Sequence, residues 1–118
     1  MNKKILLVED ERALCLLYEE ELSREGYDVT AVMDAEAALA ALAKTAFDLI
    51  ITDIRMPGKN GIELITQIMG LRKDIPIIIN SAYQSYKEDF MTWAADAYVV
   101  KSASLDELKA KIKQLIGD

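Results

Sequence analysis

Residues 49–53 constrain the fold of this 118-residue chain more than any other stretch. The first four residues, Leu-Ile-Ile-Thr, are apolar or β-branched without polar alternation, which is typical of a strand covered on both faces of a parallel sheet. The run ends at Asp53, and residues 57–61, which contain proline and glycines, then turn the chain away from the sheet. Open α/β sheets place their ligands at the carboxyl ends of their strands. Asp53 is therefore a candidate for chemistry or metal binding, although an aspartate here would equally suit a helix N-cap or a turn.

Further apolar runs predict strands, and segments with helical periodicity follow each of them. The predicted strands lie at residues 5–8, 27–32, 49–52, 76–79 and 97–100, and the predicted helices at about 13–25, 34–43, 62–70, 86–93 and 105–116. Alternating strands and helices at this spacing predict a parallel sheet with helices on both faces. The whole chain, residues 1–118, is expected to form a single α/β domain.

Local signals define the faces and ends of three of these helices. A stripe of the first helix is expected to face the core, namely Leu14, Leu17, Tyr18 and Leu22. Gly26 is placed for a left-handed C-cap of this helix, and Asp34 for the N-cap of the second. Ser104 and Glu107 match a capping box that would open the last helix.

The composition excludes several classes of function. Acidic residues outnumber basic ones by 20 to 14, a net charge of -6, so neither nucleic acid nor an anionic membrane is expected to attract this domain. The absence of histidine excludes Ser-His-Asp triads and His-ligated zinc sites within the chain. The lone Cys15 excludes an internal disulfide and is expected to be a small core residue. Without a membrane-spanning apolar stretch or a cleavage site near the start, a cytoplasmic protein is expected.

Polar residues follow four of the predicted strands: Glu9 and Asp10, Asp53, Ser81, and Lys101. Because the strands are expected to be parallel, these side chains should meet at one edge of the sheet. Three clustered carboxylates repel one another and would stay ionised in a partly desolvated pocket only with a cation among them. Mg²⁺ is the cation that best fits a site with so few protein oxygens, because it retains several waters and usually binds one or two carboxylates plus phosphate oxygens.

This set of groups is suited to phosphoryl transfer. A metal ion and the Lys101 ammonium would neutralise the phosphoryl oxygens, and Ser81 would donate a hydroxyl. Asp53 is the best candidate for the nucleophile, since an aspartate can accept a phosphoryl group as an acyl phosphate. Taken singly, Lys101 could be a solvated strand-end charge and Ser81 a turn hydroxyl, and only the combination with the acidic residues favours a site.

The chain resembles the receiver (CheY-like) domain of bacterial two-component response regulators over its whole length. The residues that carry the resemblance are Glu9-Asp10, Asp53 with Met56-Pro57-Gly58 and Gly61, Ser81-Ala82, and Lys101. The resemblance implies a three-layer flavodoxin-like (βα)5 fold with the strand order 2-1-3-4-5. It also implies a signalling switch that catalyses its own phosphorylation and dephosphorylation, rather than a turnover enzyme.

The same resemblance implies roles for individual residues. Asp53 would accept a phosphoryl group from a sensor histidine kinase or a histidine phosphotransfer protein. Asp10, Asp53 and the backbone carbonyl of Arg55 would bind Mg²⁺ or Mn²⁺, with Glu9 beside them in the second shell. Lys101, together with Ser81, would hold the phosphoryl oxygens.

Further implications concern signalling and the lifetime of the phosphorylated state. Ser81 and the aromatic Tyr98 would form the switch, with the fourth helix, fifth strand and fifth helix as the output face towards an unidentified partner. Tyr98 could equally be an ordinary half-buried strand aromatic. Arg55 and Tyr83 would border the path of the hydrolytic water, and because both are large we expect slow self-dephosphorylation.

Three departures from the family pattern leave a second function open. Ser102 stands where receivers usually have a proline, Ala94 stands where a glycine commonly ends the fourth helix, and the interval from Ser81 to Lys101 is shorter than usual. The alternative is a pseudo-receiver, a protein-interaction module without effective phosphotransfer. A small Mg²⁺-dependent phosphatase or a flavodoxin-like electron carrier is a third class. Nothing in the sequence resembles a flavin phosphate loop, and a hydrolase would need a second acid/base residue near Asp53.

Overall fold

The computed structural model describes residues 2–53, 66–67, 75–81, 96–101 and 105–117. Five strands and three helices are assigned in this part of the chain. The strands are β1 (Lys4–Val8), β2 (Asp28–Val32), β3 (Leu49–Thr52), β4 (Ile77–Ser81) and β5 (Ala97–Val100). The helices are α1 (Arg12–Arg24), α2 (Ala35–Lys44) and α5 (Asp106–Ile116). None of the described helices has the length and apolar character needed to cross a membrane.

The five strands form one parallel sheet in the order β2-β1-β3-β4-β5. The parallel sheet expected from the sequence and the order 2-1-3-4-5 implied by the resemblance are both confirmed. In this order β1 lies beside β3, so the strands that carry the acidic residues are neighbours. The carboxyl ends of all five strands face the same edge of the sheet, which is the edge that ligands use in this class of fold.

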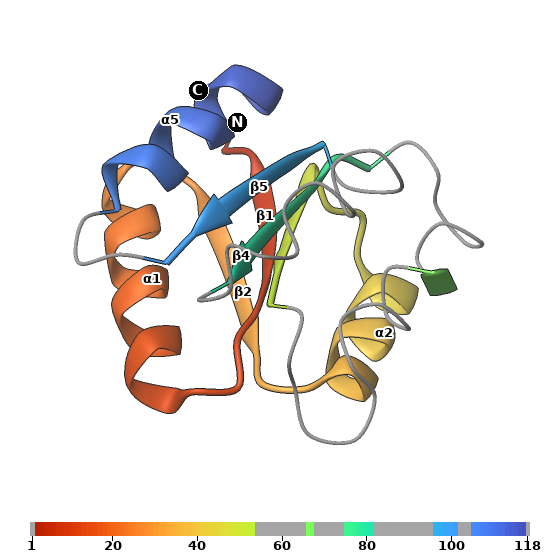
Figure 1. Cartoon of the computed structure of the whole chain (residues 1–118). Helices are drawn as coiled ribbons and strands as arrows, with labels where there is room; N and C mark the ends of the chain where they lie inside the picture. The colour runs from red at the N-terminus through yellow and green to blue at the C-terminus, as the bar shows by residue number, and fades with distance from the viewer. Residues whose placement is uncertain (1, 54–65, 68–74, 82–95, 102–104, 118) are drawn as a thin grey trace.

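Helices cover both faces of the sheet, which gives the expected three layers (Figure 1). One core cluster joins alternate strand residues to Tyr18 and Leu22 of α1 and to Leu108 and Ile112 of α5. The other cluster joins the remaining strand residues to α2, whose alanines allow the helix to approach the sheet closely. The strands are thus apolar on both faces because both faces are covered.

The signals at the ends of the first two helices are confirmed. Gly26 has a φ of 97°, a left-handed conformation that is costly for other residues, and it comes directly after Glu25, the C-cap residue of α1. Asp34 caps α2, since its Oδ1 accepts a hydrogen bond from the backbone N–H of Ala37 at 2.7 Å.

The predicted core stripe of α1 is wrong at one position. Leu17 is 43% exposed, whereas Cys15, Tyr18 and Leu22 are buried. The buried residues are spaced three and four apart, and a helix turns about 100° per residue, so Leu17 lies to one side of this stripe.

The last helix begins later than predicted. α5 starts at Asp106 with Leu105 in the N-cap position, and Leu105 makes no side-chain cap. The expected capping box stays a prediction, because Ser104 lies outside the described residues. Asp106 and Glu107 supply negative charge to the first turn, which favours the positive end of the helix dipole. Lys109 joins α5 to α1, with its Nζ 3.0 Å from Glu21 Oε1.

The fourth strand is also displaced from its predicted position. It runs from Ile77 to Ser81, so Ser81 is the last strand residue rather than part of the following loop. The ladder between β4 and β5 pairs Ser81 with Val100, and this pairing extends the strand beyond the apolar run. Within the predicted third helix only Thr66 and Gln67 are described, both helical and exposed. The predicted fourth helix, Ala94 and Ser102 lie outside the described residues.

Candidate functional site

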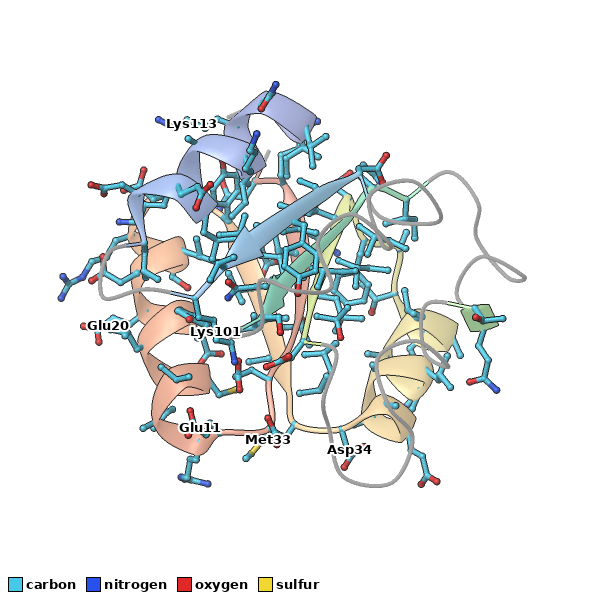
Figure 2. All side chains as sticks on the ribbon, viewed as in Figure 1. Glu11, Glu20, Met33, Asp34, Lys101 and Lys113 are labelled. Carbon is cyan, nitrogen blue, oxygen red and sulfur yellow. The ribbon has the colours of Figure 1, made fainter. Side chains whose placement is uncertain are left out.

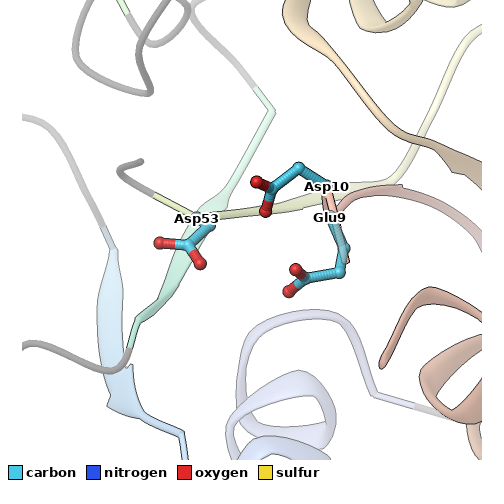
Figure 3. A group of neighbouring side chains, drawn as sticks. All are labelled: Glu9, Asp10 and Asp53. Atoms are coloured by element: carbon cyan, nitrogen blue, oxygen red, sulfur yellow. The ribbon is translucent and has the colours of Figure 1, made fainter. Parts of the chain in front are cut away.

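Three carboxylates meet at the carboxyl edge of the sheet. Glu9 and Asp10 follow β1, and Asp53 follows the neighbouring β3. One oxygen of each carboxylate lies within 4.8 Å of those of the other two, and the three side chains face a common space (Figure 3). Glu9 is 2% exposed and Asp53 7%, while Asp10 is half-buried. The meeting predicted from the strand ends is confirmed for these three residues.

Lys101 reaches the same cluster from β5 on the other side of β4 (Figure 2). Its Nζ lies 2.6 Å from Asp53 Oδ2 and 2.7 Å from Glu9 Oε1, and its side chain is 14% exposed. Its backbone N–H donates to the carbonyl of Ser81 at 2.7 Å, which fixes the start of the side chain. Lys101 is therefore a partly buried ion-pair partner of both acids and not a solvated strand-end charge.

The ionisation of these groups reflects the burial of the cluster. Burial raises the pKa of Glu9, and the hydrogen bonds from Lys101 and from the Glu11 backbone offset this only in part. Burial alone would lower the pKa of Lys101, but its hydrogen bonds to Asp53 and Glu9 outweigh burial and raise it. Lys101 therefore carries its positive charge throughout the neutral range.

Glu9 plays a different part from the two aspartates. Its Oε1 pairs with Lys101, and its Oε2 accepts a hydrogen bond from the backbone N–H of Glu11 at 3.1 Å. Both oxygens of Glu9 are therefore engaged, so it orients the ammonium. Asp10 and Asp53 are better placed to offer oxygens to a metal ion, and a pair of carboxylates with room for waters suits Mg²⁺.

Ser81 and Tyr98 are buried, at 0% and 3% exposure. Tyr98 belongs to the core cluster on the α2 side of the sheet. Alternation along β4 places Ser81 on this side too, because Ile77 and Ile79 belong to the same cluster. The interpretation of Tyr98 as half-buried is thus wrong, and both residues of the predicted switch lie on one face of neighbouring strands.

Asn80 is a polar member of this region that the sequence reasoning did not select. It is 4% exposed and lies inside β4, where it pairs with Val99. Alternation puts it on the α1 and α5 side, because Ile78 belongs to that core cluster. The sequence did carry a signal for this residue. Asn80 is polar, it follows the apolar run 76–79 directly, and it stands one position before Ser81.

Two candidate residues cannot be placed. Arg55, whose carbonyl was expected to bind the metal, and Tyr83, expected to affect hydrolysis, lie outside the described residues. Their roles stay predictions.

Comparisons with known proteins show the family of the chain. A family model described as the response regulator receiver domain matches residues 5–113. The chain is 36% identical to the response regulator ArlR of Staphylococcus saprophyticus over 114 residues, which are 96% of this chain and 52% of ArlR. The chain spans about half the length of the first curated relatives it matches.

Solved structures show the same similarity. The response regulator protein TrrA of Thermotoga maritima, crystallised in complex with Mg²⁺-BeF, is 45% identical, with a TM-score of 0.90 and coverage of 96% of this chain and 98% of TrrA. A second structure shows TrrA in complex with the histidine kinase ThkA; it matches with a TM-score of 0.89, 45% identity and coverage of 97% and 98%.

Proposed function

The chain belongs to the response regulator receiver domain family of two-component systems, and from this premise we propose that Asp53 accepts a phosphoryl group in a Mg²⁺-dependent reaction. The observation that carries the proposal is the Lys101 ammonium, held 2.6 Å from Asp53 Oδ2 beside an acidic group able to hold a metal ion. A buried carboxylate beside an ammonium and a metal-binding group can act as a nucleophile towards phosphorus.

The proposed step forms one bond and breaks one. An Asp53 carboxylate oxygen attacks the phosphorus, while the bond from phosphorus to the donor's imidazole nitrogen breaks and the electron pair stays on that nitrogen. Mg²⁺, when bound, neutralises charge on the phosphoryl oxygens and fixes their orientation. Glu9 holds the Lys101 ammonium close to Asp53, where it can pair with the phosphoryl oxygens as the charge moves onto them.

The proposed donor is a sensor histidine kinase or a histidine phosphotransfer protein. The complex of TrrA with the kinase ThkA supports this class of partner, since TrrA shares fold and sequence with the chain. We propose that Ser81 and Tyr98 transmit the change from the site to the face formed by β5 and α5, where an output partner would bind. Their burial on neighbouring strands, on one face of the sheet, supports a coupled movement.

Intact mass after incubation with acetyl phosphate and Mg²⁺ tests the proposal. We expect one phosphoryl adduct in the wild type and none in Asp53→Asn or in metal-free samples. Asp48→Asn is a matched control and should leave the adduct intact, because Asp48 is an exposed aspartate whose carboxylate accepts a hydrogen bond from the Lys4 backbone N–H, away from the acidic cluster. A folded wild type without adduct at saturating acetyl phosphate would instead support the pseudo-receiver alternative.

The decay of this adduct tests the expected lifetime. Arg55→Asn combined with Tyr83→Ala should hydrolyse faster than the wild type if these large side chains restrict the attacking water. Equal decay rates would contradict that role.

A further inference from the structure

Asn80 completes a polar row across three adjacent strands. Val8 pairs with Thr52, and Thr52 pairs with Ile79, so one further step along the strands places Glu9, Asp53 and Asn80 side by side. All three share the α1 and α5 side of the sheet. The preceding row on this side consists of Leu7, Ile51 and Ile78, which are apolar and buried. The change from apolar to polar therefore occurs at the same level in all three strands.

Lys101 must pass over β4 to make its two ion pairs. It follows β5, whereas Asp53 and Glu9 follow β3 and β1, and β4 lies between. Asn80 is the residue of β4 on this side at that level. Register and alternation therefore put the carboxamide of Asn80, and not a hydrocarbon side chain, on the face of β4 that Lys101 crosses.

A carboxamide in this position departs from the apolar pattern of the strand. Burying an amide is unfavourable unless it gains hydrogen bonds, and the rest of β4 on this side is apolar. A lysine ammonium has three N–H donors, of which one serves Glu9 and one Asp53 in the unphosphorylated site. Phosphorylation turns the Asp53 oxygen into part of an acyl phosphate and weakens it as a partner, so the ammonium must move towards the phosphoryl oxygens.

We propose that Asn80 is a positioning residue for Lys101, whose carboxamide oxygen accepts an N–H as the ammonium moves from Asp53 to the phosphoryl group. This inference rests on the proposed phosphorylation of Asp53. A neutral acceptor suits this task, because it holds the ammonium without competing with the phosphoryl oxygens as a carboxylate would. Glu9 holds one N–H of the ammonium throughout, and Asn80 replaces the acceptor that Asp53 gives up.

Asn80→Thr and Asn80→Val separate the polar atom from packing. Threonine and valine have nearly the same shape and both suit strands, but only threonine keeps an oxygen acceptor. With acetyl phosphate and Mg²⁺, we expect the valine variant to be phosphorylated about tenfold more slowly than the wild type, a barrier increase of about 1.4 kcal/mol. The threonine variant should stay within about threefold of the wild type.

Two readouts exclude a merely structural role. Valine removes a buried polar group, so its urea unfolding midpoint should equal or exceed that of the wild type while its rate falls. The ¹⁵Nζ signal of Lys101 should shift in the valine variant more than in the threonine variant. If both variants react at the wild-type rate, or both are equally slow, the role of the carboxamide oxygen is refuted while the proposed function stands. If the wild type forms no adduct, the proposed function and this inference fail together.

Discussion

At the scale of single residues, Lys101 offsets the repulsion between the buried carboxylates of the acidic cluster. Glu9 and Asp53 are both buried, and each would repel the other in the absence of a cation. The ammonium lies within 2.7 Å of Glu9 and 2.6 Å of Asp53. The same group that is proposed to assist phosphoryl transfer therefore also holds the site together before any metal or phosphoryl group arrives.

Lys101→Met should consequently destabilise the fold. Removing one partner of a buried ion pair leaves uncompensated charge, and we expect a loss of about 3 kcal/mol in the free energy of unfolding measured in urea at neutral pH. Added Mg²⁺ should recover more stability in this variant than in the wild type, because the metal offsets the remaining repulsion. Lys109→Met is the matched control, since the acidic partners of Lys109, Glu21 and Glu25, are much more exposed than Glu9 and Asp53, and its removal should cost less. Equal losses in the two variants would contradict this account.

At the scale of elements, the start of α2 depends on one side chain. Asp34 Oδ1 accepts from the backbone N–H of Ala37, which the helix itself cannot satisfy. The helix buries only small or aliphatic residues, namely Ala35, Ala38 and Leu42. Since its alanines contribute little packing area, capping carries a larger share of its stability than in a bulkier helix.

Asp34→Ala should lower the urea unfolding free energy by about 1 kcal/mol. Asp34→Asn keeps an acceptor at the same position and should lose much less. Because Asp34 is exposed, neither change creates a cavity. An asparagine variant as unstable as the alanine variant would show that the charge near the helix dipole, and not the hydrogen bond, stabilises the helix.

At the scale of the whole molecule, the sheet has a core cluster on each face, and α1 packs against one of them. Cys15 is a buried residue of this helix. Burial raises the pKa of the Cys15 thiol, and the nearby charges of Glu19 and Glu9 raise it further. Unfolding exposes the thiol and returns it towards its ordinary value of 9.0. The folded state therefore keeps a proton that the unfolded state releases in alkaline solution.

This difference makes stability depend on pH. The contribution of Cys15 should be fully present below the unfolded pKa and should be lost as pH rises through the raised folded pKa. We expect the unfolding free energy of the wild type, relative to Cys15→Ala, to decline from about pH 9 upwards. Urea titrations of both proteins between about pH 7.5 and about pH 10.5 measure it. If the difference in unfolding free energy between the two proteins stays constant over this range, the pKa of the Cys15 thiol is not raised in the folded state.

The sequence by itself determined the strands of the sheet and the residues at its carboxyl edge. Apolar runs, their spacing and their polar ends are local signals, and parallel connection then brings Glu9, Asp10 and Asp53 together. The helix ends at Gly26 and Asp34 were predictable for the same reason, because caps depend on neighbouring backbone.

Only the tertiary structure decided which side each residue faces and what it contacts. Leu17 is exposed because the packing of α1 on the sheet selects a narrower stripe than periodicity suggests. Ser81 and Asn80 both belong to β4, because pairing with β5 extends that strand. The double contact of Lys101 with Glu9 and Asp53 joins residues that are far apart in the chain. Such contacts depend on strand order and register, which arise from the packing of the whole sheet and not from any local pattern.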